Sequence, residues 1–97
     1  MPKGYMLSAH RKLADPEKAD AYRALAQPAL EAMGGKIIAA ADNIVAKENG
    51  LAGRTVLIEF ESMAGAVAAY ESDGYKKVLD VLEGGADRDI RLFEGLE

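Results

Sequence analysis

The spacing of apolar residues divides the chain into six segments, each with the period of one type of secondary structure. Four segments alternate between two kinds of side chain, as strands do because successive residues point to opposite faces: residues 4–11, 36–46, 54–60 and 88–94. Two segments have apolar residues every three or four positions, the period of a helix that buries one side: residues 16–33 and 63–82. The pattern therefore predicts the order strand, helix, strand, strand, helix, strand.

Capping and breaking residues refine the two predicted helices. Asp15-Pro16 offers an N-cap carboxylate followed by proline at the first helical position, and Gly34-Gly35 offers a left-handed stop. Pro28 lies inside this helix and predicts a kink or a restart near Gln27, because proline removes a backbone hydrogen bond. In the second helical segment, Ser72-Asp73-Gly74 predicts a break that leaves two shorter helices.

The two middle strands are expected to form a hairpin. Asn49-Gly50 is a turn signal between two strand patterns, so the flanking strands should pair antiparallel. The run Ala39-Ala40-Ala41 blurs the alternation of the first of these strands, and we expect a bulge near Asp42.

The order of elements predicts one small α+β domain over residues 1–97. Two split β-α-β crossovers, each right-handed, place the strands in an antiparallel sheet of order 4-1-3-2. Both helical segments then cover one face of this sheet. We expect the strands to contribute the following residues to the common core: Tyr5, Leu7, Val56, Ile58, Phe60, Ile90 and Leu92.

The opposite face of the predicted sheet combines apolar and polar side chains. Met6, Leu57 and Phe93 would form an apolar patch there, and a patch of this kind marks an interface. A homodimer with the two sheets packed face to face would cover it. We expect a small-molecule cleft near the open ends of that interface, lined by four polar side chains: Ser8, His10, Glu59 and Arg91.

Each of these polar side chains has a structural interpretation beside the functional one. His10 is the natural proton carrier because an imidazole titrates near neutrality, but it is also explained as a polar lining or interface residue. Glu59 would act as a base if the dimer closes over it, or would pair with an arginine across the interface. Arg91 would bind a carboxylate or form an ion pair, and for Arg88 we expect a surface ion pair.

The composition of the chain disfavours several classes of binding partner and cofactor. The net charge of -4 disfavours nucleic acid and anionic membranes, because the field of the whole molecule repels phosphate. The chain contains no cysteine and one histidine, so we expect no disulfide, no metal site and no cofactor. No signal sequence or spanning segment is visible in the pattern, and the cytoplasm is the expected location.

Several short segments resemble one known family, domain-of-unknown-function family 1330. The resemblance is carried by Gly4-Tyr5-Met6-Leu7, by Gly34-Gly35, by residues 56–63, by the spacing of Tyr70, Ser72 and Tyr75, and by the ending from Arg88 to Glu94-Gly95. It implies a ferredoxin-like fold and the face-to-face sheets of a dimeric α/β barrel. The family has no settled reaction, so the resemblance assigns no catalytic residue.

Two hypotheses of function follow from these observations. The first is a homodimeric domain with a small-molecule cleft between its sheets, either ligand-binding or a cofactor-independent enzyme for a small anionic or carbonyl compound. The alternative is a structural or interaction module whose polar sheet residues fix the register of the dimer. RNA binding is disfavoured because only Phe93 could stack on bases and the charge is negative.

Overall fold

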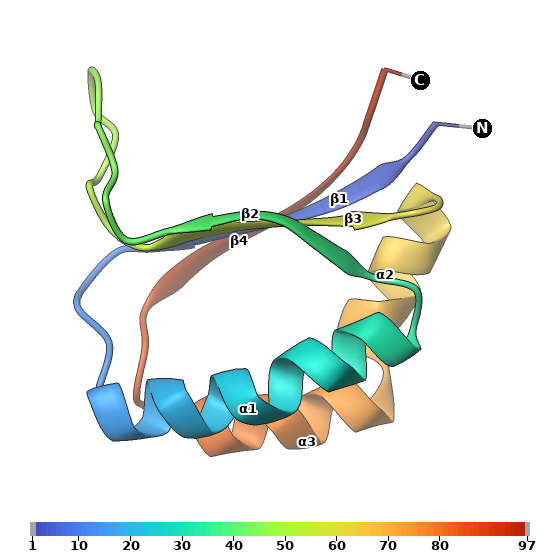
Figure 1. Ribbon diagram of the computed structural model, residues 1–97, viewed down its shortest axis with the longest axis horizontal. Helices are drawn as coiled ribbons and strands as arrows, with labels where there is room; N and C mark the ends of the chain where they lie inside the picture. The colour runs from blue at the N-terminus through green and yellow to red at the C-terminus, as the bar shows by residue number, and fades with distance from the viewer. Residues whose placement is uncertain (1, 97) are drawn as a thin grey trace.

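The computed structural model describes residues 2–96, which form a four-stranded sheet with three helices on one of its faces (Figure 1). The elements in chain order are β1 (Gly4–His10), α1 (Pro16–Ala32), β2 (Lys36–Ala41), β3 (Thr55–Phe60), α2 (Met63–Glu71), α3 (Asp73–Leu82) and β4 (Arg88–Glu94). The strands lie in the order β2-β3-β1-β4, and each neighbouring pair is antiparallel. The predicted α+β topology is confirmed.

The first helix begins where its cap predicts. The carboxylate of Asp15 accepts hydrogen bonds from the backbone N–H groups of Glu17 and Lys18, at 3.1 and 3.4 Å. The sequence predicts either a kink or a restart of this helix near Gln27. The restart does not occur, because α1 continues through Pro28 to Ala32. Proline removes one intrahelical hydrogen bond, and the remaining turns are enough to continue the helix.

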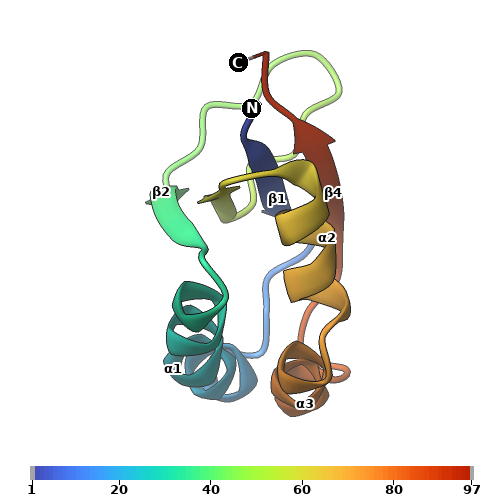
Figure 2. The same cartoon turned by 90° about the vertical axis from the view of Figure 1, so that its right-hand side faces the viewer.

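A single residue separates α2 from α3, as the predicted break requires. Ser72 ends α2 and begins α3, and its hydroxyl oxygen accepts the N–H of Tyr75 at 3.2 Å while its O–H donates to Ala69 at 2.8 Å. The chain changes direction here, so α2 leads away from the sheet and α3 lies beside α1 (Figures 1 and 2).

The second strand is shorter than the sequence predicts. β2 ends at Ala41 rather than at residue 46, and its irregular register lies between Ile37 and Ala39 rather than near Asp42. The turn that follows is closed by a 2.8 Å hydrogen bond from the N–H of Gly50 to the carbonyl of Lys47, within a loop of residues 42–54. This loop rises from the sheet on the side opposite the helices (Figure 1).

The predicted inner and outer faces are correct for β3 and β4 and wrong for β1. Met6 is only 1% exposed and packs in the core, although we expected it on the dimer face. Its register partners are Ile58 on β3 and Leu92 on β4, and all three side chains face the helices. Both sides of β1 contain large apolar residues, so alternation alone identifies a strand but not which face is buried.

Tyr5 and Leu7 of β1, which we expected in the core, lie on the outer face of the sheet. Tyr5 and Leu7 are partly exposed there, and the Tyr5 ring stacks on Phe93 with ring centroids 5.8 Å apart. Leu57 shares this face because it is the register partner of Leu7. Two of the three predicted dimer-face residues, Leu57 and Phe93, are therefore on the open face, and the third is not.

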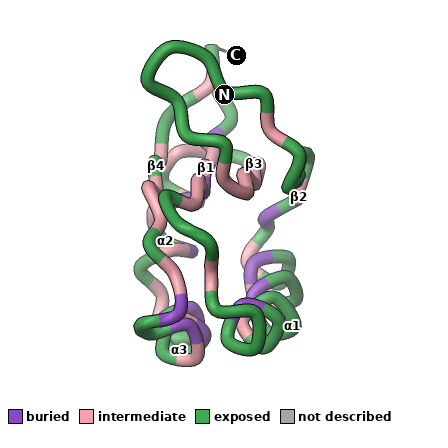
Figure 3. The backbone as a smooth tube through the Cα atoms, turned by 90° about the vertical axis from the view of Figure 1, so that its left-hand side faces the viewer, coloured by how far each residue is buried: buried purple, intermediate pink, exposed green. Residues whose placement is uncertain are grey.

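The buried cluster lies between the sheet and the helices, while the loop above the sheet is largely exposed (Figure 3). Its largest fully buried side chains are Tyr75, Phe60 and Met6. Tyr75 belongs to α3, whose buried side also includes Val78 and Leu82. The core thus joins α3 to the inner face of the sheet.

Candidate functional site

A cavity of about 880 Å³ lies between the inner face of the sheet and the helices. Its sheet wall includes Met6, Ser8 and His10 of β1, and its helix wall includes Tyr22 of α1 and Tyr75 of α3. Figure 2 shows how the two helices lie side by side below the sheet, α1 toward β2 and α3 toward β4. This volume is within the range of small-molecule pockets, roughly 300–1,000 Å³.

The structure divides the four predicted site residues between two faces. Ser8 and His10 line this cavity, whereas Glu59 and Arg91 lie on the outer face of the sheet. Arg91 instead pairs with Asp89, with 3.0 Å between Nη2 and Oδ2. The four residues do not form one cleft, because the face of β1 that carries Ser8 and His10 is turned toward the helices.

A polar cluster in the cavity was missed by the sequence interpretation. Arg88 is the register partner of His10 across β1 and β4. Its Nη1 donates a hydrogen bond to the Tyr22 hydroxyl at 3.2 Å, and its guanidinium carbon lies 4.9 Å from the centroid of that ring. The Tyr22 hydroxyl also hydrogen-bonds with the hydroxyl of Tyr75. The surface ion pair expected for Arg88 is therefore wrong: this arginine contacts Tyr22 inside the cavity.

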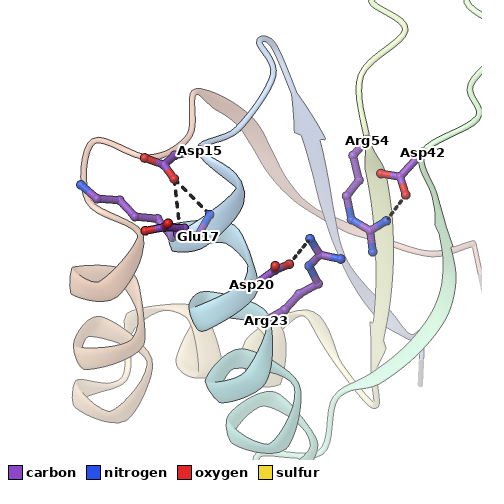
Figure 4. Close-up of polar contacts among 7 residues, drawn as sticks. Asp15, Glu17, Asp20, Arg23, Asp42 and Arg54 are labelled. Carbon is purple, nitrogen blue, oxygen red and sulfur yellow. Dashed lines mark hydrogen bonds and ion pairs between the residues drawn. The ribbon is translucent and has the colours of Figure 1, made fainter.

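Two further arginines lie at the cavity wall. Arg23 of α1 pairs with Asp20 at 3.3 Å, and Arg54, just before β3, pairs with Asp42 at 3.1 Å. Figure 4 shows both guanidinium groups turned into the space between α1 and the sheet. The Arg54 side chain is 23% exposed, whereas its partner Asp42 is 80% exposed. The carboxylate therefore lies at the solvent side and the guanidinium closer to the interior.

Cationic side chains outnumber anionic ones around this cavity. The lining includes the carboxylates of Asp20 and Asp42, and five cationic residues: Arg11, Lys12, Arg23, Arg54 and Arg88. The cavity is thus positive in a protein whose net charge is -4. A positive cleft with low-dielectric walls attracts anions.

The electrostatic surroundings determine the protonation state of His10. Burial lowers the pKa of His10 below its ordinary value of 6.5, and the positive charges of Arg88, Arg54 and Arg23 lower it further. The carboxylate of Asp42 opposes this shift but does not reverse it. His10 is therefore a neutral imidazole at pH 7, able to accept a proton.

The pKa of Tyr75 is shifted upward, whereas that of His10 is shifted downward. Burial raises the pKa of its hydroxyl well above the ordinary value of 10.0, and the neighbouring Tyr22 raises it further. Tyr75 therefore keeps its proton across the physiological pH range and is available as a hydrogen-bond donor.

Within residues 2–96, no group of three or more His, Asp or Glu side chains has the arrangement of a metal site. The helices among these residues are also too short or too polar to cross a bilayer.

Comparison with solved structures shows the fold class. A protein of unknown function from Rhodopseudomonas palustris is 17% identical, with a TM-score of 0.74, and the match covers 99% of this chain and 84% of that one. A putative antibiotic biosynthesis monooxygenase from Nitrosomonas europaea is 17% identical, with a TM-score of 0.56 and coverages of 98% and 90%. SnoaB, a cofactor-independent oxygenase from Streptomyces nogalater, is 11% identical, with a TM-score of 0.59 and coverages of 99% and 93%.

These likenesses and the strand order define a ferredoxin-like α+β protein. The sequence itself matches the model of the domain of unknown function DUF1330 over residues 3–96. The chain belongs to this family. No functionally curated protein matches it.

Proposed function

We propose that the cavity binds a small organic anion with an apolar body, and that the protein acts on it as a cofactor-independent enzyme. The observation that supports this proposal is the set of three guanidinium groups, Arg23, Arg54 and Arg88, around a neutral His10. Planar guanidinium groups bind carboxylates through paired, charge-assisted hydrogen bonds. A carboxylate here would also offset the mutual repulsion of the three arginines.

The remainder of the cavity suits an apolar or aromatic group. Met6, Leu30, Val56 and Ile58 supply apolar walls, and all four are buried or partly buried. Such walls with a few convergent polar groups are typical of ligand sites. The cofactor-independent character is supported by the chemistry of the lining, because an imidazole and a tyrosine hydroxyl are able to exchange protons with a ligand directly.

Anion binding is testable with a fluorescent pair of probes. 8-Anilino-1-naphthalenesulfonate carries an aromatic body and a negative charge, and N-phenyl-1-naphthylamine is its neutral counterpart. We expect Arg54→Gln and Arg88→Gln each to weaken binding of the anionic probe about tenfold or more, because each removes a charge-assisted hydrogen bond. Binding of the neutral probe should change much less.

The matched control for this experiment is Arg91→Gln. Arg91 lies on the outer face, so its replacement removes the same charge without altering the cavity. Equal weakening by the control variant, or unchanged binding in both cavity variants, would contradict anion binding in the cavity.

We further propose that two copies of the chain pack through the outer faces of their sheets. Leu7 and Leu57 are adjacent on this face, and the stacked rings of Tyr5 and Phe93 extend the apolar area. Phe93 is 43% exposed although it is large and apolar. A second copy would remove this area from water, and each 100 Å² buried contributes roughly 2.5 kcal/mol before the costs of association.

Replacing a central outer-face residue tests the dimer. Leu57→Asp should convert the assembly to a folded monomer of 10.3 kDa, because burying one carboxylate from each copy in the interface is unfavourable. Sedimentation velocity at micromolar concentration measures the mass. Leu13→Asp is the control, since Leu13 is 99% exposed in the loop before α1. A wild-type chain that sediments as a monomer would refute the proposed dimer.

A further inference from the structure

The hydrogen bonds of the Tyr22 hydroxyl leave its own proton directed away from its two partners. Arg88 has only donors, so the Tyr22 oxygen accepts from Arg88. Tyr75 is 1% exposed, and within the described residues the Tyr22 oxygen is the one acceptor in contact with its hydroxyl. If Tyr75 did not donate, its buried O–H would lack an acceptor, which is costly. Tyr75 therefore donates to Tyr22 as well.

A tyrosine hydroxyl has two acceptor positions and one hydrogen to donate. Both acceptor positions of Tyr22 are filled, by Arg88 and by Tyr75. Its hydrogen is thus free for a third group, and Tyr22 lines the cavity. The two donors also stabilise any negative charge that develops on this oxygen.

His10 lies on the sheet wall of the cavity and Tyr22 on its helix wall, and Arg88 relates the two. Directly opposed residues on antiparallel strands have Cα atoms roughly 4.5–5.5 Å apart, and His10 is directly opposite Arg88, which contacts Tyr22. Within residues 2–96 no hydrogen bond ties the imidazole to another side chain, so its basic nitrogen is available to a ligand. The cavity thus holds a proton acceptor on its sheet wall and a polarised proton donor on its helix wall, and Arg88 neighbours both of them.

We propose that His10 and Tyr22 form an acid–base pair that transfers a proton at the carbon beside the carbonyl group of a small keto acid. This inference rests on the proposed function, because the carboxylate of such a substrate would occupy the anion site at Arg23 and Arg54. The ketone oxygen would accept hydrogen bonds from Tyr22 and Arg88. The acidic C–H bond would then face His10.

The step balances without an oxidant or a cofactor. The imidazole nitrogen takes the proton, and the electrons of the C–H bond form the carbon–carbon double bond of an enolate. The electrons of the carbonyl double bond move to the oxygen, where Tyr22 supplies a proton or a strong hydrogen bond and Arg88 supplies positive charge. If Tyr22 gives its proton to the oxygen, the product is the enol, and the proton held by His10 returns to Tyr22 through solvent. If His10 instead returns a proton to carbon, the ketone is regenerated with its hydrogen exchanged against solvent.

Phenylpyruvate in heavy water tests this inference directly. It combines a carboxylate, a ketone, an acidic methylene group and an aromatic ring, and proton NMR measures the loss of its methylene signal. We expect the protein to accelerate this exchange above the buffer rate. His10→Gln should reduce the acceleration by about 100-fold or more, in line with the usual contribution of a general base. Tyr22→Phe, which keeps the ring, should reduce it by about tenfold or more.

The pH profile provides a readout that a structural role would not change. Three guanidinium groups face His10, from Arg88 on β4, from Arg54 before β3 and from Arg23 on α1, and the carboxylate of Asp42 faces it from the loop after β2. Because His10 loses its proton below pH 6.5, the exchange rate should be constant from neutral pH upward and fall only below that value. A rate that still rises between pH 7 and 9, where its pKa leaves His10 already deprotonated, would assign the base to another group and overturn the inference.

Binding and turnover are measured separately so that the two proposals can fail independently. Arg91→Gln is expected to leave both unchanged, because Arg91 lies on the outer face. If phenylpyruvate raises the melting temperature of the wild type but not of Arg54→Gln, and exchange still equals the buffer rate, the acid–base pair is refuted while the anion site stands. Wild-type exchange in His10→Gln likewise refutes the pair. If phenylpyruvate neither stabilises the wild type nor exchanges, both proposals fail for keto acids.

Discussion

Met6→Asp is expected to leave the chain unfolded, whereas Leu7→Asp should remain folded. Met6 is 1% exposed within the core cluster, and Leu7 is its neighbour on the opposite face. Truncating a buried methionine alone costs about 2–5 kcal/mol. An unpaired buried carboxylate adds several kcal/mol more, which together approaches the whole stability of a small domain, about 5–15 kcal/mol. Circular dichroism with urea titration measures both variants.

The same pair of variants decides which face of β1 is inside. Met6→Leu is the control for packing, since a swap of similar volume usually costs less than about 1.5 kcal/mol. A stable Met6→Asp variant together with an unfolded Leu7→Asp variant would mean that β1 has the opposite orientation and that His10 does not line the cavity.

Gly4→Ala should strongly destabilise the protein, and Gly74→Ala should stabilise it slightly. A Cβ atom at Gly4 would lie 2.3 Å from the carbonyl oxygen of Ser62 and 2.7 Å from the Cα of Met63. Both contacts are with backbone, which cannot move aside as a side chain can, so we expect a loss of about 2 kcal/mol or more. Gly74 lies in α3 with nothing within 4 Å of the added atom. There, alanine should contribute about 0.5–1 kcal/mol.

Denaturant midpoints of the two alanine variants measure this difference, and each variant serves as the control for the other because the chemical change is identical. If Gly4→Ala unfolds at the wild-type midpoint, the close approach of β1 to the start of α2 is absent in solution.

The architecture was predictable because strands and helices have different periods. Within residues 54–60, the apolar Ile58 and Phe60 lie on one face of the strand and the charged Glu59 on the other. Both the strand and its buried face therefore follow from sequence. The predicted cap at Asp15 marks the beginning of α1, and the predicted break at Ser72-Asp73-Gly74 coincides with the start of α3. Both signals are local in the sequence. In contrast, β1 carries Tyr5 and Leu7 on one side and Met6 on the other, and its buried face depends on contacts with other elements.

The site was less predictable than the fold. His10 was identified because it is the one histidine in the chain and its imidazole titrates near neutrality. Its partners Arg88 and Tyr22 come from β4 and α1 and lie 66 residues apart, so no local pattern links them. The signal that could have found Arg88 is the register itself, because an antiparallel pairing of β1 with β4 places it opposite His10. The positions of Arg23 and Arg54 depend on how α1 lies against the sheet, which periodicity does not specify.

The irregular register of β2 has a consequence for self-association. β2 is an edge strand of the sheet. It runs from Lys36 to Ala41 and contains five consecutive apolar residues. A flat edge of this composition would template the addition of further strands and lead to fibres. The interruption between Ile37 and Ala39 disturbs the row of backbone donors and acceptors that an incoming strand would need. This edge is therefore a poor template, which helps to protect an alanine- and isoleucine-rich strand from amyloid-like growth.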